Sequence, residues 1–187
     1  MNHSDIIVPS DSLAARLGIA NGLSELLNAR GVYTAECRDA DGNLIWRDTF
    51  KNLVTTVGGN FILDTTLSGS AYTAAWYMGL ISSASYTTGP AAGDTMASHG
   101  GWTESVAYSN AARPTTAWSS ASGRTKSLSA GLVFTINATD TIKGCFMNTV
   151  ATKSGTTGTL LSAGLFTGGD QPVVSGNSLT VSYSLSV

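Results

Sequence analysis

Apolar and hydroxyl-bearing side chains alternate without a break in Ser178-Leu179-Thr180-Val181-Ser182-Tyr183-Ser184-Leu185, close to the end of the sequence. Successive side chains of a β-strand point to opposite faces. The four apolar residues of this run therefore share one face, and the serines and the threonine share the other. The pattern predicts a strand with one face in a core and the other in contact with water.

Short runs of strand-forming residues precede this one, and glycine, serine, asparagine and proline separate them. Many short strands with such punctuation are typical of a β-sandwich or a jelly roll. We therefore expect a mainly β protein with a β-sandwich or jelly-roll-like body. The expected strands cover residues 75–81, 102–108, 125–128, 132–136, 141–149, 159–166 and 178–185.

A β-hairpin is predicted for residues 32–50, around the turn Asp39-Ala40-Asp41-Gly42. Asp-Gly is a strong turn signal because glycine adopts positive φ without steric cost and aspartate tolerates it. Asp39, Asp41 and Asn43 also have the spacing of the first ligands of a calcium loop. That loop needs glycine where Leu44 stands and glutamate where Phe50 stands, so the sequence favours a hairpin turn.

A short helix is predicted for residues 56–66, where apolar residues keep a loose helical spacing after Thr55 or Thr56 as the N-cap. The Gly58-Gly59 pair in this segment does not form a phosphate-binding loop. No Lys-Ser or Lys-Thr follows it, and the GxGxxG spacing is missing.

The sequence predicts two parts, an N-terminal arm and helix in residues 1–31 and a β-sandwich body in residues 32–187, and charge is concentrated towards the N-terminus. Residues 1–51 hold 12 of the 22 charged side chains of the chain. Residues 1–9 are predicted to form an extended arm that ends at Pro9, and a short amphipathic helix is predicted to follow as far as Arg30. Its apolar stripe, called the leucine stripe below, consists of Leu13, Leu17, Ala20, Leu23 and Leu27. Gly18 and Gly22 weaken such a helix by about 1 kcal/mol each, so it needs a surface to pack on, which is either its own body or a neighbouring subunit.

The composition excludes several classes of function. The chain has 187 residues and a formal net charge of −2, and only 12% of its residues are charged. A nearly neutral chain lacks the clustered lysine and arginine of a nucleic-acid-binding protein. No apolar run approaches the ~20 residues of a membrane helix, and the first residues lack the basic and apolar regions of a secretory signal. Few ionisable side chains also argue against an enzyme.

His99 is the one histidine of the body, in a segment that also contains Asp94, Ser98 and Glu104. Adjacent residues of a strand point to opposite faces, and catalytic triads draw their members from separated segments, so a triad is not expected. The sequence offers no second histidine or cysteine for a metal cluster here, and no cofactor is expected. Two interpretations of this segment remain: it is a structural loop, or it is a loop that binds a partner through His99 and Trp102.

Three further sets of side chains have simpler explanations than a functional one. The aromatic residues Trp76, Tyr77, Trp102, Tyr108 and Trp118 could form a sugar-binding platform, but core packing is the more common role of such residues. Arg113 is interpreted as a loop residue. The two cysteines, Cys37 and Cys145, fit no zinc or CxxC spacing and are predicted to be free buried thiols of a protein made in a reducing compartment.

Several segments resemble virion proteins of tailed bacteriophages. These are Asn52-Leu53-Val54-Thr55 with Gly58, the run Trp76-Tyr77-Met78-Gly79-Leu80, residues 94–104 with Tyr108 and Arg113, and residues 155–183. The similarity spans about residues 45–187. The chain departs from the family-like form before its last strand, where Gly176-Asn177 replaces Gly-Asp. The resemblance implies a small β-rich accessory protein of the virion and brings no catalytic residues with it.

The expected function is therefore that of a capsid decoration or cement protein, which binds the assembled shell and stabilises it. The alternative is a tail-fibre or tail-tip module that binds a receptor or a glycan. The expected partners are the major capsid protein or other virion subunits and further copies of the chain, with no nucleic acid and no membrane. The expected location is the virion, most simply the capsid surface, after synthesis in the host cytoplasm. The candidate partner-binding residues are Leu13, Leu17, Leu23, Leu27, His99 and Trp102.

Overall fold

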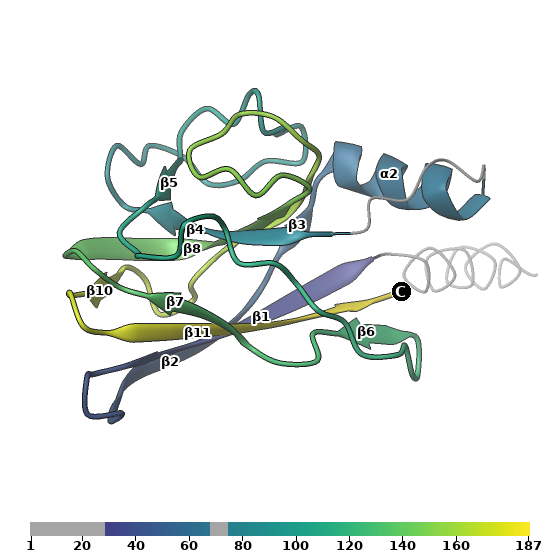
Figure 1. The fold of residues 1–187 in the computed structure, drawn as a ribbon. Coiled ribbons are helices and arrows are strands. Elements are labelled where there is room, and N and C mark those ends of the chain that lie inside the picture. Colours follow the sequence, from purple (N-terminus) through teal and green to yellow (C-terminus); the bar gives the residue numbers. More distant parts are fainter. Residues whose placement is uncertain (1–28, 68–74) are drawn as a thin grey trace, which may run out of the picture.

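Two antiparallel sheets pack against each other in the computed structural model, which describes residues 29–67 and 75–187 (Figure 1). The first sheet has the order β2-β1-β11, and the other edge of β11 pairs with both β7 and β6. Its strands are β1 (Arg30–Arg38), β2 (Leu44–Lys51), β6 (Thr125–Ser127), β7 (Leu132–Thr135) and β11 (Ser178–Ser186). The predicted β-sandwich body is confirmed.

The second sheet has the order β3-β9-β8-β4-β5, with β10 paired to the beginning of β8. Its strands are β3 (Leu53–Val54), β4 (Tyr77–Ser82), β5 (Thr103–Ser105), β8 (Asp140–Asn148), β9 (Leu160–Leu165) and β10 (Gln171–Val173). The sequence analysis did not anticipate the short strands β3 and β10. The chain crosses from one sheet to the other between Lys51 and Leu53, where β2 ends and β3 begins.

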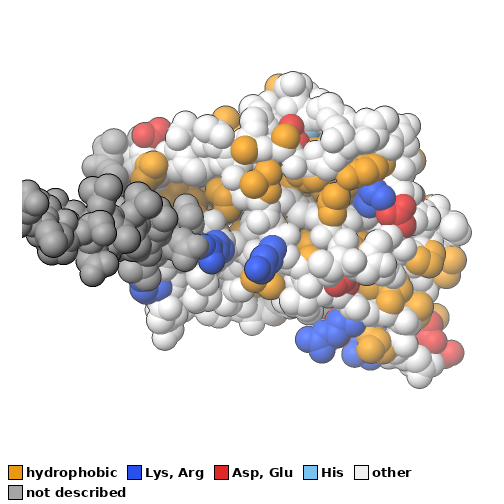
Figure 2. Space-filling model, turned by 180° about the vertical axis from the view of Figure 1, so that it is seen from behind, with side chains coloured by type: hydrophobic (Ala, Val, Ile, Leu, Met, Phe, Trp, Pro, Cys, Tyr) orange, Lys and Arg blue, Asp and Glu red, His pale blue; other side chains and the backbone are white. Residues whose placement is uncertain are grey.

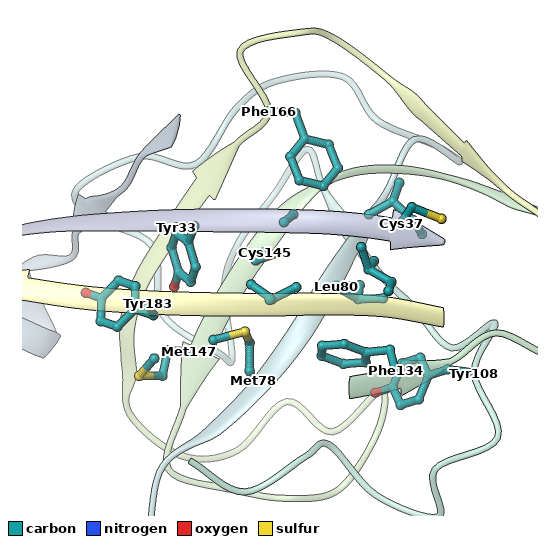
Figure 3. Close-up of a cluster of buried hydrophobic side chains, with 14 of the residues drawn as sticks. Tyr33, Cys37, Met78, Leu80, Tyr108, Phe134, Cys145, Met147, Phe166 and Tyr183 are labelled. Atoms are coloured by element: carbon teal, nitrogen blue, oxygen red, sulfur yellow. The ribbon is translucent and has the colours of Figure 1, made fainter. Parts of the chain in front are cut away.

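The main core lies between the sheets and takes side chains from both (Figure 3). The alternation predicted for the last strand is confirmed, because Leu179, Val181 and Tyr183 are buried while Ser182 is exposed. Tyr33 of β1 stacks on Phe50 with ring centroids 5.2 Å apart, and it contacts Tyr183 in a tilted arrangement at 4.5 Å. These contacts hold the first, second and last strands of the body together.

A second, smaller core lies on the outer face of the second sheet. Alternate residues of β4 and β8 face opposite sides, so Met78 and Cys145 enter the main core while Ile81 and Phe146 enter the outer one. The loop between β4 and β5 covers this outer face with the side chains of Met96 and Trp102. The second sheet is therefore buried on both faces, which explains the nearly continuous burial of β4 and β8.

The predicted hairpin and helix both form. The carboxylate of Asp39 accepts hydrogen bonds from the N–H groups of Asp41 and Asn43, at 3.0 and 2.8 Å, and Gly42 has a φ of 86°. Helix α2 (Thr56–Leu67) begins after Thr55, whose hydroxyl accepts a hydrogen bond from the Gly58 N–H at 3.1 Å. Thr55 is therefore the N-cap, one of the two residues that the sequence indicated.

The first described strand begins at Arg30, two residues before the boundary expected at residue 32. The predicted arm and most of the amphipathic helix, with the whole leucine stripe, lie outside the described residues. Within the described ranges, no helix has the length and apolar character that crossing a membrane would require.

Candidate functional site

The loop that carries His99 folds around Trp102. Gly101 has a φ of 110°, a conformation that favours glycine, and it turns the chain into β5. The Trp102 indole N–H donates to the Asp94 carboxylate at 3.0 Å, and the His99 ring stacks on the indole with centroids 4.0 Å apart. His99 Nδ1 also lies 3.1 Å from the Trp102 carbonyl oxygen.

His99 and Trp102 differ in their exposure to solvent. Trp102 is only 2% exposed and fills the outer core against Phe146, so its ring does not face solvent. His99 is half-buried and covers it. Of the two candidate residues in this loop, His99 alone presents part of its side chain to a partner.

Glu104 and Arg113 form a buried ion pair beside this loop. The Arg113 Nε and Nη2 atoms donate to the two carboxylate oxygens of Glu104 at 2.9 and 2.8 Å, in the bidentate geometry typical of strong pairs. The side chain of Arg113 is 0% exposed and that of Glu104 is 6% exposed. The interpretation of Arg113 as a loop residue missed this burial.

The ion pair connects loops that are far apart in the sequence. Arg113 also donates to the carbonyl oxygens of Val150 and Gly155, at 2.9 and 3.1 Å. Glu104 accepts further hydrogen bonds from the Ser154 N–H at 2.6 Å and from the Tyr108 hydroxyl at 3.3 Å. Burial, together with the charge of Glu104, raises the pKa of Tyr108 far above its ordinary value, so this hydroxyl is neutral and donates.

A cavity of about 290 Å³ opens next to the ion pair. Its wall combines the outer-core rings with the ion pair and with the loop 154–156. Glu104 already accepts four hydrogen bonds from its own protein, so its oxygens are engaged. Among residues 29–67 and 75–187, no cluster of three or more His, Cys, Asp and Glu side chains is arranged to hold a metal ion.

A second hollow, called the apolar groove below, lies at the end of the sandwich that carries α2. It has a cavity volume of about 200 Å³. It is lined by Phe61, Ile62, Thr65, Trp76, Trp118, Lys126, Leu161 and Leu185. Neither the groove nor the ion-pair network was predicted from the sequence. The groove joins Phe61 to Leu185, and the network joins Arg113 to carbonyl groups about forty positions further along the chain. The face of the molecule in Figure 2 carries few charged side chains, with apolar ones scattered between them.

The remaining candidate side chains are core residues. Trp76, Trp102 and Tyr108 are buried, so they do not form an exposed sugar-binding platform. Cys37 and Cys145 are free and buried, as predicted. Burial raises the pKa of Cys37 to about 11 and that of Cys145 further, so both thiols are protonated at neutral pH.

Comparison of the sequence with protein-family models and with curated proteins gives no match.

Proposed function

We propose that this chain is a structural protein of a bacteriophage particle, a capsid decoration protein that binds the assembled shell and stabilises it. The resemblance of residues 45–187 to virion proteins supports the location on a particle. The sandwich with its second, outer core suits a binding role, because the buried side chains of that outer core support the loops and hold them in place.

The Glu104–Arg113 pair is the observation that supports this proposal best. A carboxylate that accepts four hydrogen bonds from its own protein serves to hold loops in one shape rather than to transfer protons. Loops with a fixed shape lose little conformational freedom on binding, which favours identical contacts at every site of a lattice.

Mass action supplies the stabilising mechanism. A protein that binds only the assembled shell stabilises it by RT ln(1 + [L]/Kd), about 2.7 kcal/mol per site at a hundredfold excess over Kd. The N-terminal 31 residues are proposed to make the attachment to the capsid protein through apolar residues of the leucine stripe that include Leu13 and Leu17. Apolar contacts of this kind are barely screened by salt, which agrees with a chain of low charge.

The test compares particles with and without this protein. Particles that lack it are expected to assemble but to release DNA at a lower temperature or under osmotic shock. Adding the purified chain back should restore stability, whereas a chain without residues 1–28, which keeps all of β1, should not bind. Counting copies per purified particle gives a second readout, with many copies expected for a decoration protein.

Two results would overturn the proposal. Particles of unchanged robustness that no longer adsorb to host cells would identify a tail-fibre or tail-tip module instead. A copy number of only a few per particle would exclude a shell-covering protein.

A further inference from the structure

We propose that the apolar groove is the docking site of Leu23 and Leu27 of the same chain. The inference concerns the isolated protein and goes beyond attachment to a shell. It assigns the inner half of the leucine stripe to the body and leaves Leu13 and Leu17 for a partner.

The groove itself is built to receive apolar side chains. Phe61 and Trp76 meet edge to face in its wall, with ring centroids 5.3 Å apart, and Trp118 meets Tyr183 in the same way at 6.0 Å. Phe61, Ile62, Trp118 and Leu185 are only partly buried by the described residues, although they pack against the main core. Concave apolar surface of this kind usually marks an interaction site.

The position of the groove points to the residues that precede Ala29. Gly31 pairs with Leu185, which lines the groove, and Arg30 pairs with Ser186. The start of β1, the C-terminus and α2 lie at the same end of the sandwich (Figure 1). Leu27 is four residues before Gly31, a separation that an extended chain spans over at most about 14 Å. In the predicted amphipathic helix, Leu23 lies one turn before Leu27, about 6 Å along the helix axis.

The short tether to β1 favours an occupant from the same chain, and the size of the groove favours Leu23 and Leu27 alone. A segment tethered by a few residues has an effective concentration in the millimolar range, so a second copy would have to compete against it. A volume of about 200 Å³ accepts a few side chains and not the whole stripe. Lys126 in the lining of the groove also suits the C-terminal end of the predicted helix, because cations are favourable there.

Disulfide trapping on the full-length chain tests the docking directly. The double variants L27C/L185C and L27C/I62C should form an intramolecular disulfide under mild oxidation, seen as a monomer that migrates faster without reductant. The matched control is L27C/V174C, since Val174 is exposed and precedes the opposite end of β11. The native thiols are buried and should remain free. Disulfide-linked dimers would assign the groove to a second copy, and trapping no better than in the control would overturn the docking.

Thermal unfolding gives a second test that does not depend on trapping. L23D/L27D should lower Tm by about 5 °C, because two docked side chains are lost, whereas L13D/L17D should leave Tm unchanged. Equal shifts for the two double variants would contradict the proposal. So would an unchanged Tm for L23D/L27D combined with a lowered Tm for Y72A. Tyr72 belongs to the segment between α2 and β4, so that result would assign the groove to this segment. Shell binding is measured separately on particles, so its failure leaves these outcomes unaffected.

Discussion

The hydroxyl oxygen of Tyr33 lies 3.0 Å from Oγ of Ser162, and the hydrogen bond between them joins the two sheets through the middle of the core. Tyr33 belongs to β1 and Ser162 to β9, and both side chains are fully buried. Burial, with the nearby Tyr183, raises the pKa of Tyr33 well above its ordinary value, so the pair is neutral.

Removing both partners of this bond is expected to cost less than the sum of the two single removals. Tyr33→Phe and Ser162→Ala should each lower the free energy of unfolding by about 1–2 kcal/mol, because each leaves a buried hydroxyl without this partner. The double variant should lose less than the sum of the two. Denaturant unfolding of the four proteins measures the coupling, and strictly additive losses would show that the bond contributes nothing.

Breaking the Glu104–Arg113 pair should destabilise the protein strongly. Arg113→Met leaves the Glu104 carboxylate buried without its counter-charge, and a loss of about 3–5 kcal/mol is expected. The double variant E104L/R113M should be more stable than R113M alone, because it buries no unpaired charge. Thermal and denaturant melts provide the measurement. If R113M melts like the wild type, the pair does not hold the loops.

The two adjacent glycines of α2 should respond in opposite directions to alanine. A side chain at Gly58 would collide with the Leu161 carbonyl group of β9, while one at Gly59 would have no neighbour within 4 Å. Gly58→Ala is therefore expected to cost about 1–3 kcal/mol. Gly59→Ala should gain about 0.5–1 kcal/mol, since alanine favours the helix. Parallel thermal melts of the two variants decide the point, and a similar effect at both positions would contradict the close packing of helix and strand.

Asp48 should make the stability depend on pH at the acidic end. Burial by itself would raise the pKa of Asp48, but hydrogen bonds from the Gly168 N–H and the Thr167 hydroxyl outweigh it and lower the pKa below 3.8. A lowered folded pKa contributes stability that is complete above the unfolded value and is lost as the pH falls through the folded one. Asp48→Asn should therefore destabilise at pH 7 by about 1 kcal/mol, and this loss should shrink as the pH falls towards 2. A gap that stays constant between the two pH values, measured by Tm against pH with the exposed D41N as control, would contradict this assignment.

The two faces of the last strand should differ in their tolerance of alanine. Val181 is fully buried, so Val181→Ala is expected to cost on the order of 2–4 kcal/mol. Ser182 is exposed on the other face, and Ser182→Ala should change the stability by less than about 0.5 kcal/mol. Denaturant unfolding of the pair measures the difference, and equal losses would indicate that the strand is buried on both faces.

Patterns within single segments predicted most of the fold. The alternation in residues 178–185, the Asp-Gly turn and the threonine cap each depend on neighbours in the sequence, and each appears in the structure. The strand β10 was missed because it is three residues long and contains Pro172, a residue that weakens a strand prediction.

The candidate site depends on long-range contacts, and for this reason it could not be predicted. Arg113 holds the loops together by donating hydrogen bonds to the carbonyl oxygens of Val150 and Gly155. No local sequence pattern indicates that these carbonyl groups lie next to Arg113 in the fold. The burial of Phe146 could not be predicted either. The alternation of β8 indicates which face of the sheet Phe146 lies on, but not that loops cover that face. The scarcity of charge after residue 51 was the one available signal, because Glu104 and Arg113 are successive members of a set of only ten charged side chains there.

The pairing of the first strand with the last has a practical consequence for protein engineering. Arg30 lies opposite Ser186, so the first and the last strand of the described sandwich begin and end at the same end of the molecule. The turn at residues 39–42 projects from the opposite end (Figure 1). A peptide fused to the C-terminus would lie beside the start of β1 and the apolar groove. A peptide inserted between Ala40 and Asp41 would be displayed at the far end of the molecule, on an exposed turn that follows a strand held from both sides.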